Sequence, residues 1–164
     1  MAITIDNTKF SGLLNLEVTA DTDYLDAIST QIIADLLPRW FGYALTKELI
    51  GSSTGAEAQK LIDGVEYTDN NGDLQYLTGL DDYLLYFVYF YYARDKESFD
   101  STLGSLEALA ENAAQSNPSR KLTQNYNQGV EFCNKMLTYI SDNKDKYTDA
   151  ILTTDLETIN IFGI

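Results

Sequence analysis

Pairs of neighbouring carboxylates are the groups in this sequence best suited to chemistry. Two carboxylates close together can hold a magnesium ion, or can divide the roles of general acid and general base between them. Three such pairs are present: Asp21 with Asp23, Asp81 with Asp82, and Asp142 with Asp145. However, the chain contains 25 acidic residues in 164 positions, so pairs of this kind are expected by chance. We therefore interpret them as helix caps and solvated surface, and we predict no metal site and no cofactor.

Histidine is absent from the chain, and Cys133 is the single cysteine. Histidine is the commonest general base near neutral pH, so its absence excludes the Ser–His–Asp and Cys–His nucleophile systems. A structural zinc site built from cysteine and histidine is excluded for the same reason. The segment from Asp69 to Asp73 resembles half of a calcium-binding loop, but Leu80 stands where that loop needs an acidic residue. We therefore expect the protein not to be an enzyme.

The charge balance is strongly acidic, with 25 acidic against 11 basic residues and a net charge of -14. Proteins that grip duplex DNA neutralise its phosphates with clustered Lys and Arg, whereas the basic residues here are scattered. The longest strongly apolar run, Tyr83 to Ala93, is too short to cross a bilayer, and residues 1–10 lack the pattern of a signal peptide. We expect no specific nucleic-acid binding, no membrane association and no export.

Apolar residues at helical spacing predict a first helix that begins near Thr22, with Asp21 or Thr22 as its N-cap. The stripe consists of Tyr24, Leu25, Ile28, Ile32, Ile33 and Leu36. We expect Pro38 to interrupt this helix, because proline disfavours helical conformation in the residue before it. Proline also suits the first turn of a helix, so a second helix is predicted from there to Gly51. A short helical turn is expected over residues 56–63.

A β-hairpin is predicted at about residues 65–77, where two alternating segments flank the turn-forming residues 69–72. An aromatic helix is predicted to follow from Gly79, with seven aromatic residues among the ten from Tyr83 to Tyr92. Such rings could stack on the bases of a single strand, but that also needs a basic groove, which the sequence lacks. We therefore expect the aromatic helix to form the centre of the core.

A long last helix is predicted from Pro118 to about Asp142, and residues 99–117 before it fit either a helix or an irregular loop. The predicted fold class is mainly α: a helical bundle of about four main helices with a small β-hairpin and extended N- and C-terminal arms. We expect residues 1–143 to form the bundle domain, including the N-terminal arm and the hairpin. Residues 144–164 are expected to form an extended C-terminal tail.

The C-terminal tail ends in large apolar side chains that are costly to leave in water. They are Ile159, Ile161, Phe162 and Ile164. Either the tail folds back on its own core or it docks on another chain, and the composition favours neither alternative. We take these four residues as candidate partner-docking residues.

Several short strings occur in an order that resembles a known family. Pro-Arg-Trp-Phe-Gly-Tyr at 38–43 precedes the hairpin, Gly79-Leu80 leads into the aromatic helix, and that helix carries Tyr-Ala-Arg at 92–94. An Asn- and Ser-rich connection then leads to a helix with Tyr126-Asn127. Over about residues 23–140 the chain resembles the head–tail connector (adaptor or neck) proteins of tailed bacteriophages, in particular those of crAss-like and other Bacteroides phages.

This resemblance implies a structural protein of the virion. Members of that family form rings, often of twelve copies, that bridge the portal protein to the tail or other neck proteins and surround the DNA exit channel. The implied location is the neck of the phage, with the host cytoplasm as the place of assembly. The family has no catalytic residues, and its contact with passing DNA is passive.

Two other functions compete with this hypothesis. The net charge of -14 fits an acidic protein that imitates DNA and inhibits a DNA-binding enzyme, although many of the acids lie at helix starts and in loops. An enzyme that uses carboxylates and magnesium is compatible with the absence of histidine, but no motif in the sequence favours it.

Overall fold

A computed structural model of the chain describes residues 9, 10, 14, 16, 21–51, 54–100, 118–153 and 156–159. Its elements in chain order are α1 (Thr22–Phe41), α2 (Tyr43–Ile50), α3 (Ala56–Asp63), β1 (Gly64–Thr68), β2 (Leu74–Thr78), α4 (Leu80–Asp100) and α5 (Pro118–Asp142). The predicted fold class is confirmed: the chain is a mainly helical bundle with one small antiparallel hairpin. For residues 99–117 the sequence left helix and irregular loop as alternatives. Residues 99 and 100 belong to α4, and residues 101–117 lie outside the described residues.

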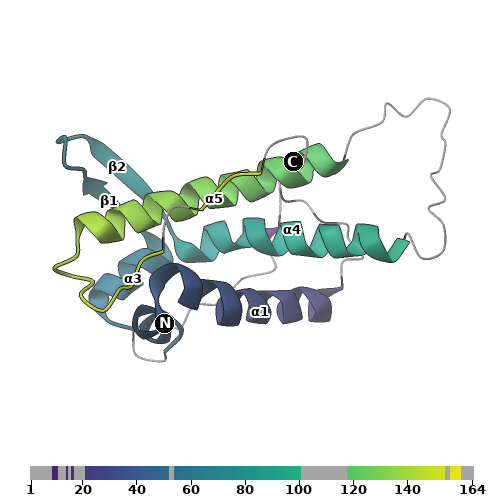
Figure 1. Cartoon of the computed structure of the whole chain (residues 1–164), viewed down its shortest axis with the longest axis horizontal. Coiled ribbons are helices and arrows are strands. Elements are labelled where there is room, and N and C mark those ends of the chain that lie inside the picture. The colour runs from purple at the N-terminus through teal and green to yellow at the C-terminus, as the bar shows by residue number, and fades with distance from the viewer. Residues whose placement is uncertain are drawn as a thin grey trace.

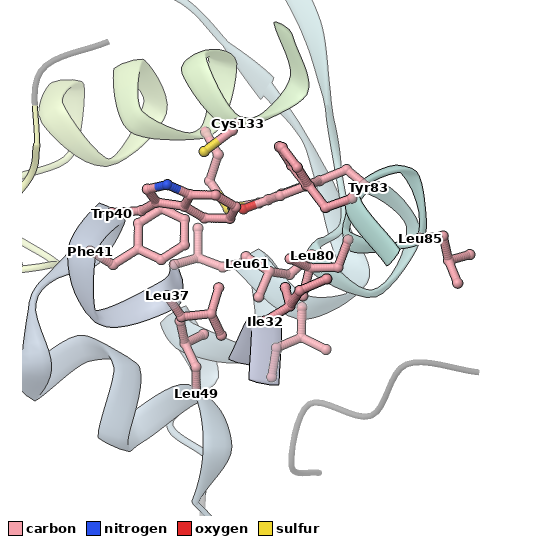
Figure 2. Close-up of a cluster of buried hydrophobic side chains, with 14 of the residues drawn as sticks. Ile32, Leu37, Trp40, Phe41, Leu49, Leu61, Leu80, Tyr83, Leu85 and Cys133 are labelled. Carbon is pink, nitrogen blue, oxygen red and sulfur yellow. The ribbon is translucent and has the colours of Figure 1, made fainter. Parts of the chain in front are cut away.

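α4 is the central helix, and it packs against α1 on one side and α5 on the other (Figure 1). Its apolar residues are buried nearly all round, which confirms the interpretation of the aromatic segment as core. The buried set comprises Leu80, Tyr83, Leu84, Leu85, Phe87, Val88, Tyr89 and Tyr92. Figure 2 shows Tyr83 of α4 in the same cluster as Trp40 of α1 and Cys133 of α5.

The prediction that Pro38 ends the first helix is wrong, because α1 continues through Pro38 to Phe41. Proline costs a helix one backbone hydrogen bond and crowds the carbonyl four residues earlier. In α1 the turn that contains Pro38 also buries Leu37, Trp40 and Phe41, each no more than 5% exposed. Burying three large side chains outweighs one lost hydrogen bond, so the tertiary structure overrides the local preference.

A glycine allows α5 to approach α4 closely. A Cβ atom at Gly129 would lie 3.0 Å from the ring of Phe87 and 3.2 Å from the Cβ of Tyr86. The space beside Gly129 is therefore filled by side chains of α4, including Phe87, whose ring also contacts Trp40 and Tyr126 with centroids 5.0 and 5.6 Å apart. This close packing joins the three long helices into one core.

The hairpin lies at the end of the bundle where α4 begins and α5 ends (Figure 1). β1 and β2 pair antiparallel, with Val65 opposite Leu77 and Tyr67 opposite Gln75. One face of the hairpin rests on the bundle, because Leu77 is buried and the ring of Tyr67 lies 4.8 Å from that of Tyr139 on α5. The structure therefore confirms the predicted hairpin and shows what supports it.

Candidate interaction surfaces

The acidic pairs singled out in the sequence lie at a helix cap, in a surface ion pair and on exposed surface. Asp21 caps α1, since its carboxylate accepts a hydrogen bond from the Tyr24 N–H at 3.1 Å. Asp82 forms an ion pair with Lys9 at 2.9 Å, and both side chains are about half exposed. Asp142 and Asp145 are exposed near the end of α5. Within the described residues, no group of three or more acidic or cysteine side chains is placed to hold a metal ion.

The start of the C-terminal tail completes the end of α1. The last carbonyls of a helix have no partner within that helix. Here the N–H groups of Ile151 and Thr153 donate to the carbonyls of Phe41 and Trp40, each at 3.2 Å. Gly42 makes this approach possible, because a Cβ there would lie 3.0 Å from Ile151 and its φ of +80° favours glycine. The tail therefore crosses the end of α1 through backbone contacts.

Further along, two asparagines of α5 hold the tail by its backbone. Asn134 donates to the carbonyl of Leu156 at 2.9 Å and accepts from the N–H of Leu156 at 2.7 Å. Asn127 makes the same pair of bonds with Ile159, at 2.7 and 2.8 Å. We call Asn127 and Asn134 the asparagine clamp. Each amide bonds one tail residue as a neighbouring β-strand would, with one donor and one acceptor.

The structure places one of the four candidate docking residues. Ile159 is half-buried beside the asparagine clamp, whereas Ile161, Phe162 and Ile164 lie outside the described residues. Leu152 and Leu156 pack against the core, so the described part of the tail lies on its own chain. The docking role of the four residues stays a prediction. The clamp was missed in the sequence, where two asparagines in a helix give no signal of what they bind.

The outer face of the hairpin carries two exposed large apolar side chains. Leu74 and Tyr76 on β2 are 73% and 61% exposed, and they lie opposite Thr68 and Glu66 of β1. Among the described residues, each strand pairs only with the other, so each also has an edge without a neighbouring strand. Exposed strand edges beside apolar side chains are sites where other chains add. Sequence alternation predicted these strands but not which face the bundle covers.

A groove of about 330 Å³ runs between α1 and α4. Ile28 and Ile32 form its floor, and Arg39 and Arg94 stand at its edge. Arg94 stacks on the ring of Tyr91, 4.8 Å from its centroid, and pairs with Asp95 at 3.2 Å. Asp95 also accepts a hydrogen bond from the Tyr24 hydroxyl at 2.9 Å, and this bond, aided by burial, raises the pKa of Tyr24. Two polar side chains of the groove, Arg94 and Asp95, thus bond each other.

Comparison of the chain with protein-family models, curated proteins and solved structures found no match. No described helix is both long enough and apolar enough to cross a membrane.

Proposed function

We propose that this protein is a structural subunit of a bacteriophage neck. In this role it forms a head–tail connector ring that bridges the portal protein to the tail and surrounds the DNA exit channel. The observation that carries the proposal is the hairpin, whose exposed Leu74 and Tyr76 lie on a strand that has no second neighbouring strand among the described residues. The family resemblance of the sequence supports the same role.

A two-stranded hairpin suits contacts between subunits. An extended segment of another chain can add to its edge through backbone hydrogen bonds, while Leu74 and Tyr76 supply apolar contact area. A closed ring needs head-to-tail interfaces, in which one surface of a subunit meets a different surface of the next. The hairpin packs on α5 near Tyr139, whereas the tail is held at Asn127 and Asn134 of the same helix, so the two lie at different places on the bundle.

The charge of the chain also suits a DNA channel. A net charge of -14 repels the phosphate backbone, so DNA can pass without being held. The same charge motivates the alternative of a DNA-mimicking inhibitor. Several described carboxylates instead serve local contacts, such as the cap at Asp21 and the turn at Asp69, rather than a phosphate-like array.

The proposal is tested by measuring mass in solution, using size exclusion coupled to light scattering, for the protein with its cognate portal protein. We expect a discrete oligomer that co-elutes with the portal. Leu74→Ser with Tyr76→Ser should weaken this complex by about tenfold or more, as the loss of interface anchors does. Tyr43→Ser is the matched control, because Tyr43 is 75% exposed on α2, away from the hairpin.

A protein that stays monomeric and does not bind the portal protein would contradict the connector role. If that monomer instead captured a DNA-binding enzyme, and released it at high salt, the result would favour the DNA-mimicking alternative. If the Leu74→Ser, Tyr76→Ser variant still bound the portal protein, the contact surface would have to lie elsewhere than on the hairpin.

A further inference from the structure

The hairpin is acidic as well as partly apolar. Residues 64–78 contain Glu66, Asp69 and Asp73 and no basic residue. Glu66 lies directly opposite Tyr76 in the strand register, so the two side chains project from the same face of the hairpin. Both are exposed, and Glu66 is in none of the ion pairs between described residues. The outer face therefore offers a partner both apolar area and an unpaired negative charge.

The groove between α1 and α4 offers the complementary charge beside an apolar floor. Arg39 and Arg94 line it together with Asp35 and Asp95, so its charges cancel in a chain of net charge -14. Arg94 is held by Asp95, whereas Arg39 is exposed and, among the described residues, belongs to no ion pair. An acidic segment is therefore repelled less here than by the chain as a whole, and Arg39 is open to an incoming carboxylate.

The groove and the hairpin also agree in length. The groove residues of α1 run from Ile28 to Arg39, a rise of roughly 16 Å. β2 has five residues, and an extended segment of that length spans roughly 14 Å between its end Cα atoms. A strand can therefore lie along the groove with Leu74 and Tyr76 on the apolar floor. A tyrosine ring also suits the neighbourhood of an arginine guanidinium, on which it can stack.

The hairpin and the groove of one chain lie too far apart to meet. The hairpin lies where α4 begins (Figure 1), whereas Tyr91 and Asp95 of the groove come roughly 16 Å or more further along that helix. Two hairpins are also poor partners for each other, because Glu66 would face a surface of the same charge. The groove of another copy is therefore the surface of this chain that complements the hairpin.

We propose that the hairpin of one copy docks in the α1–α4 groove of a second copy, head to tail. Leu74 and Tyr76 cover the apolar floor, and Glu66 pairs with Arg39. Each copy then keeps one hairpin or one groove for a further neighbour, and such contacts continue until they close into a ring. The inference rests on the proposed function and deepens it by naming the interface between neighbouring subunits.

Two variants that each lose one half of the contact provide the test. Leu74→Ser with Tyr76→Ser disables the hairpin, and Arg39→Glu disables the groove. Lys47→Glu is the control, because it makes the same charge change at an exposed position of α2. Size exclusion coupled to light scattering, over a series of concentrations, should show the unchanged protein and the control associating, and each variant associating about tenfold or more weakly. The two variants mixed should form a dimer, because one intact hairpin meets one intact groove.

A charge exchange tests the predicted ion pair directly. Glu66→Arg alone should weaken association, and Glu66→Arg combined with Arg39→Glu should restore it, because the two charges have changed places. If circular dichroism shows that Arg39→Glu does not fold, Glu66→Arg alone decides, and normal association of that variant overturns the inference.

The remaining outcomes separate this contact from the connector role. No association of the unchanged protein, no mixed dimer, or no rescue by the charge exchange overturns the inference. Co-elution with the portal protein would then still support the connector role. A mixed dimer from a protein that does not bind the portal would instead support the contact between copies and contradict the connector role.

Discussion

Asp69 organises the hairpin turn through its carboxylate. The carboxylate accepts hydrogen bonds from the N–H of Asn71 at 2.9 Å, the N–H of Asp73 at 3.0 Å and the side chain of Gln75 at 3.2 Å. Gly72 completes the turn with a φ of +90°, which favours glycine. Hydrogen bonds to the charged form, that from the Asp73 N–H first, lower the pKa of Asp69 below its ordinary value of 3.8.

The lowered pKa of Asp69 predicts a pH dependence of stability. The stabilisation by the charged carboxylate is fully present above the pKa of the unfolded chain, and it is lost as pH falls through the lower pKa of the folded chain. The difference in free energy of unfolding between the unchanged protein and Asp69→Ala should therefore be largest at neutral pH. Urea unfolding above and below pH 3.8 measures it. Asp73→Ala is the control. The prediction would be contradicted if the loss of unfolding free energy caused by Asp69→Ala were the same at every pH.

Cys133 is expected to be chemically inert in the folded protein. Burial raises its pKa to about 12, an effect only partly opposed by a hydrogen bond from Tyr83. The reactive species is the thiolate, which is scarce far below the pKa, and the buried sulfur is closed to reagents. A thiol reagent at pH 8 should not modify the native chain and should modify one thiol per chain in denaturant. Rapid native labelling would show that α5 separates from α4.

At the scale of elements, Pro38 gives a direct test of the balance between local preference and burial. Pro38→Ala should stabilise the protein, by up to about 3 kcal/mol, because α1 already has helical conformation there and regains a hydrogen bond to Ala34. Pro118→Ala is the matched control, because Pro118 is the first residue of α5, where the N–H has no helical partner. Thermal or urea unfolding measures both. Destabilisation by Pro38→Ala would mean that the proline ring itself fills a needed space.

The tail is an element of the fold even though it has no regular secondary structure. It supplies partners for the carbonyls of Trp40 and Phe41 at the end of α1, and it is held along α5 by the asparagine clamp. The tail thereby links two helices that each pack on α4. Tyr147, near the start of the tail, donates from its hydroxyl to the carbonyl of Glu57 on α3 at 3.1 Å, which adds a further contact.

At the scale of the whole molecule, the net charge of -14 opposes folding through self-repulsion. The three ion pairs between described residues all lie on the surface, where each offsets little of this repulsion. The melting temperature should therefore rise with sodium chloride from about 0.01 M to about 0.15 M, as the Debye length falls from about 30 Å to about 8 Å. An uncharged osmolyte at matched osmolality is the control. A melting temperature that falls with salt would contradict this account.

Most of the secondary structure could be predicted from the sequence, because those signals are local and repeated. The stripe of α1, the turn residues 69–72 and the aromatic run of α4 each involve many neighbouring side chains that favour the same conformation. The start of α5 at Pro118 and its end near Asp142 were predicted for the same reason. The prediction failed at Pro38, where a single residue's preference was opposed by the burial of side chains that pack on distant segments.

Composition and local patterns were enough to predict an acidic, mainly helical chain without histidine, with its long helices and its hairpin. Which surfaces remain exposed, and where the tail lies, depend on packing between distant segments. Leu74 and Tyr76 are exposed because the bundle covers the opposite face of the hairpin, and strand alternation alone does not choose the face. The asparagine clamp joins α5 to backbone groups far along the chain. Backbone N–H and carbonyl groups are the same in nearly every residue. A pattern of residue types therefore cannot predict which of them an asparagine side chain binds.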